Sequence, residues 1–229
     1  MKKVIINKGI DEEKIKIVTN WADSSINYEK KVHNSFYEKH NLNGKFNVLY
    51  TGNISKVHAI DTILNVAKLL KDSREIQFTF VGDGNRRAYI ENLKKKEKLR
   101  NIQLKDYMFG EEYNNLLNCA DVFITTLQEG IEGLGVPSKT YTYMSVSKPL
   151  IAIMNKNSEI GSMVNENNLG KQFSFNEEEE IVKFIKNIKD DTELYDSISG
   201  NVREKFRSEY ERKRVTKKFY NIVISNNNR

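Results

Sequence analysis

Between residues 47 and 175 the chain alternates short apolar runs with amphipathic runs, and this alternation limits the possible folds more than any other feature. Apolar side chains at 63, 64, 66, 67, 69 and 70 have helical spacing, whereas 76–82 alternates with the period of a strand. Strand-like runs occupy 47–52, 76–82, 102–104, 121–127, 149–154 and 171–175, and helix-like runs occupy 61–70, 85–99, 111–117, 138–146 and 159–166. Such alternation predicts an α/β fold, with a Rossmann-like parallel sheet covered by helices on both faces and right-handed crossovers.

The regions outside this alternation have different patterns. Residues 14–19 resemble an edge strand and 27–40 a polar helix, and Asn176 before four glutamates predicts a helix N-cap with an acidic first turn. Two more helices are expected at 192–206 and 211–224. We therefore expect a lead-in segment at 1–46, a Rossmann-like domain at 47–190, and C-terminal helices at 191–229 that pack on the same domain as a helical extension.

Composition excludes several classes of protein. The longest apolar runs fall short of the roughly 18 residues that span a bilayer, and the apolar run at 4–6 is too short for a signal peptide, so we expect a cytoplasmic protein. The single cysteine, Cys119, follows an apolar helix end and is predicted to be a buried packing residue.

The net charge of +6 includes basic runs at 94–96 and 212–214. These runs lack interleaved aromatic residues, so we interpret them as solvated helix faces and expect no nucleic-acid partner. Peripheral contact with an anionic membrane surface, or binding of a polyphosphate, stays open.

Ligands of open parallel sheets bind outside the carboxyl ends of the strands. In this chain those ends carry Gly52–Asn53, 82–84, Tyr107–Met108 and 129–139. The last of these is a glycine-punctuated loop between a strand and a helix, which lets backbone N–H groups approach a ligand closely. The pattern predicts a site for an anionic ligand at this edge.

Six segments in register resemble the carboxyl-terminal half of the family 4 glycosyltransferases, which have the two-lobed GT-B architecture. The segments are 9–23 (GIDEEKIKIVTNWAD), the strand and turn at 48–61, 80–84 (FVGDG), 116–124 (LLNCADVFI), 132–135 (EGLG) and 136–149 (VPSKTYTYMSVSKP). The variant of the last motif is similar to that of polysaccharide-assembly enzymes, with transferases of N-acetyl-fucosamine or related amino sugars as the nearest kind. The resemblance implies that this lobe binds a nucleotide sugar, that transfer retains the anomeric configuration, and that neither a metal nor another cofactor is needed.

The resemblance also implies roles for particular residues of the loop after residue 127. Glu132 matches the first acid of the family's paired-glutamate motif, and as the catalytic residue it would accept hydrogen bonds from donor-sugar hydroxyls near the developing positive charge. Glu129 is the alternative. The backbone amides of Gly133, Leu134 and Gly135 would face the sugar and the diphosphate.

The helix that follows would hold the diphosphate and the ribose. Ser138 and Lys139 begin it, and Lys139 is the candidate partner of the phosphate oxygens. Thr142 stands where the family has a second glutamate for the ribose, and its hydroxyl can make only one such bond. Tyr143 is open between packing and ligand contact.

The remaining donor-binding candidates lie at other strand ends. The family's phosphate-binding turn is replaced here by Gly52, Asn53 and Lys56. The sequence does not decide whether His58 is an exposed side chain or a phosphate partner. Gly82 and Asp83 form the next loop, and Tyr107 and Met108 take the base-contacting position. His33 and His40 are expected on the surface, and no His, Cys or Asp cluster has metal-ligand spacing.

The sequence therefore predicts the donor-binding half of a retaining glycosyltransferase, which moves a sugar from a UDP-linked donor to a polysaccharide or lipid-linked acceptor. Because the family's acceptor lobe has no counterpart in these 229 residues, we expect either an excised half or a chain that works with a separate acceptor-lobe chain. The alternative is a non-catalytic nucleotide-sugar-binding or assembly module. Thr142, Ser147 in place of a family glycine, and the absent lobe favour that alternative.

Overall fold

The computed structural model describes residues 2–22, 26, 28, 35–55, 58–131 and 133–227. Their strands form one six-stranded sheet of order β3-β2-β1-β4-β5-β6, in which every neighbouring pair is parallel. The strands are β1 (Phe46–Thr51), β2 (Ile76–Val81), β3 (Ile102–Lys105), β4 (Val122–Thr126), β5 (Leu150–Ile153) and β6 (Gly170–Phe173). The predicted Rossmann-like parallel sheet is thus confirmed.

The sheet opens where the strand order reverses, between β1 and β4. β1 pairs with β2 along its whole length, but it pairs with β4 only at Val48↔Val122 and Leu49↔Phe123. Tyr50 and Thr51 of β1 therefore continue beyond the last paired position. In open α/β sheets such a switch point is where a ligand crevice forms.

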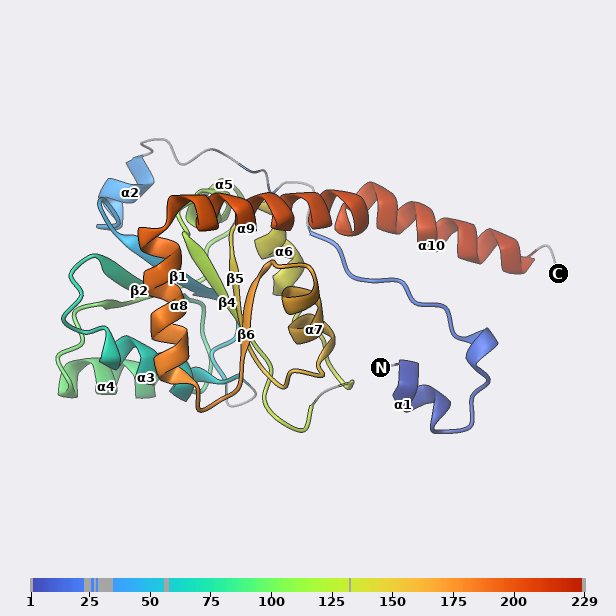
Figure 1. Ribbon diagram of the computed structural model, residues 1–229, viewed down its shortest axis with the longest axis horizontal. Coiled ribbons are helices and arrows are strands. Elements are labelled where there is room, and N and C mark those ends of the chain that lie inside the picture. Colours follow the sequence, from blue (N-terminus) through green and yellow to red (C-terminus); the bar gives the residue numbers. More distant parts are fainter. Residues whose placement is uncertain are drawn as a thin grey trace.

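Helices cover the sheet on both faces, with α3 and α4 to one side and α6 and α7 to the other (Figure 1). α8 packs against α3, while α9 and the π-helical turn η2 pack against α6. The elements are α3 (Ile60–Leu69), α4 (Arg87–Lys96), α5 (Gly110–Asn118), α6 (Lys139–Ser145), α7 (Glu159–Glu166), α8 (Glu178–Asp190), α9 (Thr192–Lys205), η2 (Phe206–Tyr210) and α10 (Arg212–Asn227). On α3 the buried residues Ile60, Ile63, Leu64 and Ala67 follow the predicted helical spacing. Cys119 is buried, as predicted.

The lead-in segment differs from the prediction. It contains α1 (Lys2–Ile6), η1 (Glu12–Lys14) and α2 (Ser35–Lys39), and neither α1 nor η1 was predicted. The edge strand predicted at 14–19 is wrong, because Lys14 ends η1 and residues 15–20 have no regular structure and belong to none of the strands of the sheet. The helix predicted at 27–40 is present at 35–39, while 27 and 29–34 lie outside the described residues.

Two local predictions also need correction. The residue before α8 is Glu177, not Asn176, and the Glu177 carboxylate accepts a hydrogen bond from Ser174 N at 2.7 Å instead of capping the helix. The predicted acidic first turn is present. His40 is not a free surface residue, because its Nδ1 lies 2.8 Å from Lys105 Nζ and its ring packs on Phe36. His33 lies outside the described residues.

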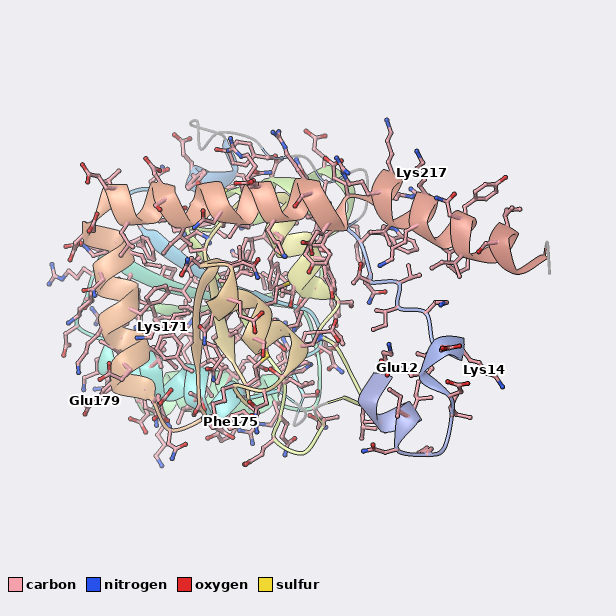
Figure 2. All side chains as sticks on the ribbon, turned by 45° about the vertical axis from the view of Figure 1, so that its right-hand side comes forward. Glu12, Lys14, Lys171, Phe175, Glu179 and Lys217 are labelled. Atoms are coloured by element: carbon pink, nitrogen blue, oxygen red, sulfur yellow. The ribbon has the colours of Figure 1, made fainter. Side chains whose placement is uncertain are left out.

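α10 continues well past the sheet on the same side of the molecule as the lead-in segment (Figure 1), and Lys217 lies in its first half (Figure 2). It exposes Phe219, Tyr220, Val223 and Ile224. Within the described part of the chain, no helix is long and apolar enough to cross a membrane. The assignment of residues 47–190 and 191–229 to separate segments stays a prediction.

Candidate functional site

A cleft with a volume of about 660 Å³ lies at the carboxyl end of β1, where β1 and β4 separate. Three connections and the start of α6 supply its walls, so residues far apart in sequence meet there. The polar and aromatic lining residues are Thr51, Asn53, His58, Tyr107, Phe109, Tyr113, Ser138, Lys139 and Thr142, and the other lining residues are Ile26, Gly52, Val81, Met108, Gly110, Val136 and Pro137.

The cleft brings together seven of the fourteen predicted site residues. These are Gly52, Asn53, Tyr107, Met108, Ser138, Lys139 and Thr142. Lys56 and Glu132 lie outside the described residues, so the predicted catalytic group has no described position. The donor-binding roles of all these residues stay predictions.

The other five predicted residues do not line this cleft. Gly82 lies against its wall, since a Cβ there would be 2.1 Å from the carbonyl oxygen of Gly52. Asp83 is exposed and its carboxylate accepts a hydrogen bond from Gly84 N at 2.8 Å. Gly133 and Gly135 line a neighbouring pocket of about 380 Å³, and Leu134 between them is 66% exposed.

Lys139, the first residue of α6, is the charged group in the wall of the cleft. Its Nζ donates a hydrogen bond to the carbonyl oxygen of Thr51 at 3.0 Å and lies 3.9 Å from the centre of the Tyr50 ring. Within the described chain no carboxylate forms an ion pair with it. Burial lowers the pKa of Lys139 from 10.5 to about 7. The position therefore holds a cation that lacks a described counter-charge.

Thr51 is a structural centre of the site that sequence reasoning missed. The Thr51 N–H donates to the Tyr143 hydroxyl at 2.9 Å, and that hydroxyl donates to the Thr51 carbonyl oxygen at 3.2 Å. The Tyr113 hydroxyl lies 3.2 Å from Thr51 Oγ1. Tyr143 is buried and stacks on Phe123 with ring centres 4.1 Å apart, so it packs beneath the cleft without lining it. No sequence motif predicts these contacts, because they join β1 to α5 and α6, which are far away in the sequence.

Replacing Tyr143 with Phe is expected to keep the stack on Phe123 and to lose the hydroxyl bonded to Thr51. A buried backbone N–H would then lack its acceptor, and we expect the free energy of unfolding to fall by about 1–3 kcal/mol. Urea denaturation followed by circular dichroism measures this change. The matched control is Tyr220→Phe on α10, where the side chain is 64% exposed and no loss is expected. Equal stability of the two variants would contradict the structural role of the Tyr143 hydroxyl.

His58 is half-buried in the wall of the cleft. Its Nδ1 lies 3.2 Å from the Thr126 carbonyl oxygen at the end of β4, and its ring meets that of Tyr50 edge-on. Burial, together with the nearby charge of Lys139, lowers the pKa of His58 to about 4. His58 is therefore a neutral side chain near pH 7 that links the ends of β1 and β4.

No three His, Cys, Asp or Glu side chains of the described ranges gather in a way that could hold a metal ion. Because Glu132 and other residues lie outside those ranges, the expectation of metal-free chemistry stays a prediction.

The strand order and the cleft at its switch point define a Rossmann-like lobe of the kind found in GT-B glycosyltransferases. The chain belongs to the family described as glycosyl transferases group 1, whose model matches residues 33–205. The probable glycosyltransferase WbjE of Pseudomonas aeruginosa is 31% identical over 175 residues, which cover 74% of this chain and 42% of WbjE. The chain thus spans less than half the length of this relative.

Solved structures show the same fold at low sequence identity. HepE of Anabaena, whose crystal structure is a complex with UDP, superposes with a TM-score of 0.80 at 14% identity, over 98% of this chain and 61% of HepE. The C-terminal domain of LpcC from Francisella tularensis superposes with a TM-score of 0.65 at 16% identity, over 83% of this chain and 99% of that domain.

Proposed function

We propose that this chain is the donor-binding half of a retaining glycosyltransferase, which moves a sugar from a UDP-linked nucleotide sugar to a polysaccharide or lipid-linked acceptor. The observation that carries the proposal is Lys139, a half-buried cation without a described counter-charge in a 660 Å³ cleft at the switch point. A diphosphate would supply the missing negative charge. Membership of the glycosyl transferases group 1 family and the UDP-bound relative HepE support the choice of ligand.

The lining residues suggest how the parts of the donor are held. Lys139 and Ser138 would bind the diphosphate from one wall and Asn53 from the other. The ribose would receive one hydrogen bond from Thr142. The base would lie at the rim beside Tyr107, Met108 and Phe109, where the rings of Tyr107 and Phe109 have centres 6.4 Å apart.

The sugar would extend toward the loop that carries Gly133 and Gly135, with Glu132 as the catalytic carboxylate and Glu129 as the alternative. We further propose a donor of the amino-sugar type, transfer without a metal or other cofactor, and a cytoplasmic location with peripheral contact at the inner face of the membrane. Transfer requires the acceptor to be held in line with the donor. We therefore propose that a separate acceptor-lobe chain, or an acceptor lobe in the same protein, completes the enzyme.

Calorimetric titration with UDP and with UDP-glucose tests the binding claim. We expect saturable one-to-one binding, since a cation, polar side chains and aromatic groups all line the same cleft. Exchange of Lys171 for Met is a control that should leave the affinity unchanged, because Lys171 lies on the edge strand β6 (Figure 2) and does not line the cleft. Absence of heat and of chemical-shift changes at millimolar ligand would refute the proposal.

The second candidate function is a non-catalytic nucleotide-sugar-binding module. Thr142 favours it, because this cleft residue offers a single hydroxyl where a carboxylate would bind both ribose oxygens. Ser147 argues less strongly, since its φ of +56° shows that the turn after α6 keeps the left-handed backbone that glycine adopts. Slow hydrolysis of UDP-sugar by the wild-type chain, lost on Glu132→Ala, would favour the enzyme over the module.

A further inference from the structure

We propose that α10 is the part of this chain that binds a membrane surface rich in anionic lipid headgroups. The inference deepens the proposed function, since it assigns the peripheral membrane contact to one helix, and it rests on that function for the lipid-linked acceptor. Binding of the chain to vesicles can be measured without any donor, so the inference and the proposed function are tested separately.

From Phe219 onward α10 exposes a cluster of large apolar side chains. The exposed fractions are 56% for Phe219, 64% for Tyr220, and 41% for each of Val223 and Ile224. Because residues three and four positions apart are neighbours on the surface of a helix, these four side chains share one face. α10 continues past the sheet and the helices that cover it (Figure 1), and the described chain leaves this apolar cluster open to solvent.

The same helix is strongly basic. Residues 212–227 contain no acid, and five cations precede the apolar cluster, namely Arg212, Lys213, Arg214, Lys217 and Lys218. Within the described residues, none of the cations at 213, 214, 217 and 218 forms an ion pair. The charge of α10 is therefore available to an anionic partner.

Positive charge continues from α10 onto the lead-in segment. A groove of about 910 Å³ lies between the two, and none of its described lining residues is acidic. Its cations are Lys2, Lys16, Arg214, Lys217 and Lys218. Lys2 is paired with Glu12 at 2.8 Å, so the other four carry the unbalanced charge. Phosphate groups of lipid headgroups would supply the missing negative charge.

An anionic membrane matches this combination of charge and apolar surface. A helix that lies in the membrane interface places its lysines and arginines near lipid phosphates and its aromatic and aliphatic side chains among the upper acyl chains. The core of a protein–protein interface is instead depleted of lysine, whereas here Lys218 directly precedes the apolar cluster. A second copy of the chain, docked through the same face, would bring like charges together.

The place of α10 in the fold also suits a lipid-linked acceptor. α10 follows η2, and η2 packs against α6, whose first residue Lys139 lines the cleft. A membrane bound along α10 would therefore be held at a fixed position relative to the donor cleft.

Co-sedimentation of the full chain with lipid vesicles tests the inference. One set of vesicles contains phosphatidylcholine alone, and the other has about one third of it replaced by phosphatidylglycerol. We expect the chain to bind the anionic vesicles at least about tenfold more tightly than the neutral ones, because several cations act together. This preference should weaken as added salt screens the charges.

A pair of charge reversals tests whether the basic residues of α10 make the contact. Lys217→Glu/Lys218→Glu is expected to weaken binding to the anionic vesicles by at least about 20-fold, since each basic residue near the surface contributes about fivefold. The matched control is Lys95→Glu/Lys96→Glu, which makes the same change in net charge at exposed positions of α4 and should have a much smaller effect. Equal losses in the two variants would show that net charge alone drives binding, and would overturn the assignment to α10.

A second pair of variants tests the apolar cluster. Phe219→Ala is expected to weaken binding to the anionic vesicles by about tenfold, because the ring no longer enters the acyl region. Leu69→Ala on α3 is the control, since Leu69 is also 56% exposed but lies outside α10, and it should bind as the wild type does. Circular dichroism confirms that each variant is folded.

The remaining outcomes separate this inference from the proposed function. A wild-type chain that binds UDP-glucose but no anionic vesicles would overturn the inference and leave the proposed function intact; the exposed face would then belong to a protein partner such as the acceptor lobe. Dimers that form without vesicle binding and dissociate in Phe219→Ala would overturn it as well, with a second copy as the occupant. Vesicle binding that follows the variants, in a chain that binds no UDP-glucose, would support the inference and refute the proposed function.

Discussion

Replacing Lys139 with Met is expected to weaken donor binding strongly while making the fold more stable. Loss of charge-assisted hydrogen bonds to a diphosphate weakens binding by about 1.5–3 kcal/mol, roughly 10- to 100-fold. The same change removes a half-buried cation whose described partners are one carbonyl oxygen and one aromatic ring. The straight Met side chain fills similar space without a charge. Opposite effects on binding and stability are typical of a residue retained for function.

The stability gain depends on pH, and its sign follows from the lowered pKa. The unfolded chain holds the Lys139 proton up to about pH 10.5, while the folded chain releases it above about pH 7. Wild-type stability should therefore rise with pH between 7 and 10.5, and the advantage of Lys139→Met should be largest at or below pH 7. One pKa unit corresponds to about 1.4 kcal/mol, and because water reaches the cleft we expect a reduced gain of about 2 kcal/mol.

Urea denaturation at pH 6.5 and pH 9.5, with UDP-glucose titration at pH 7, measures both effects. Lys171→Met is the matched control, since Lys171 is exposed on β6 with its Nζ 5.3 Å from the Phe173 ring centre. Neither its stability nor its donor affinity should change appreciably. A Lys139→Met chain that is less stable than wild type at pH 6.5 would show that the cation is paired, and our description of the site would then be wrong.

Replacing Gly82 with Ala is expected to destabilise the fold by roughly 3–5 kcal/mol and to abolish donor binding. Gly82 has φ of +137°, and a Cβ there would lie 2.1 Å from the carbonyl oxygen of Gly52 and 2.9 Å from its carbonyl carbon. Neither backbone can yield without moving the end of β1, which forms one wall of the cleft. The variant therefore tests whether close packing of the two strand ends shapes the site.

The matched control is Gly200→Ala, in the middle of α9. Nothing lies within 4 Å of a Cβ at Gly200 and no left-handed φ is involved, so helix propensity should make this variant about 0.5–1 kcal/mol more stable. Thermal unfolding and UDP-glucose titration of both variants are the measurements. A Gly82→Ala chain that melts within a degree or two of wild type would show that the β1 and β2 ends separate easily.

The periodicity of the sequence predicts the sheet and its covering helices because each element has one clearly buried side. The buried stripe on α3 and the complete burial of β4 leave little choice of structure. The edge strand predicted at 14–19 failed because alternation alone does not provide a neighbouring strand. Ile17, one of its apolar positions, is 51% exposed. The local sequence pattern therefore predicts a helix or strand reliably only when the rest of the fold provides a surface or a strand against which it can pack or pair.

At the candidate site, the sequence pointed to Lys139 and Asn53, which both line the cleft, while their roles in donor binding stay predictions. The hydrogen bonds beneath these cleft residues could not be predicted. The bond from Thr51 N to the Tyr143 hydroxyl joins positions 92 residues apart. Neither residue type reveals that pairing, and Tyr143 could equally have faced a ligand. The exposed Phe109 at the rim was also missed, because nothing local separates it from a packing residue.

The brief pairing of β1 with β4 has a consequence for the order of folding. Strands β1 to β3 and strands β4 to β6 each associate through nearby segments, whereas the seam between the two halves is fastened by contacts such as Asn47 N to the Asp121 carboxylate, at 2.7 Å and 74 positions apart. The entropy cost of closing a long loop must be met before the contacts across the seam can stabilise the fold. We therefore expect this seam to form late. Because the cleft lies on the seam, a half-folded chain has no cleft, and ligand binding reports only completely assembled molecules.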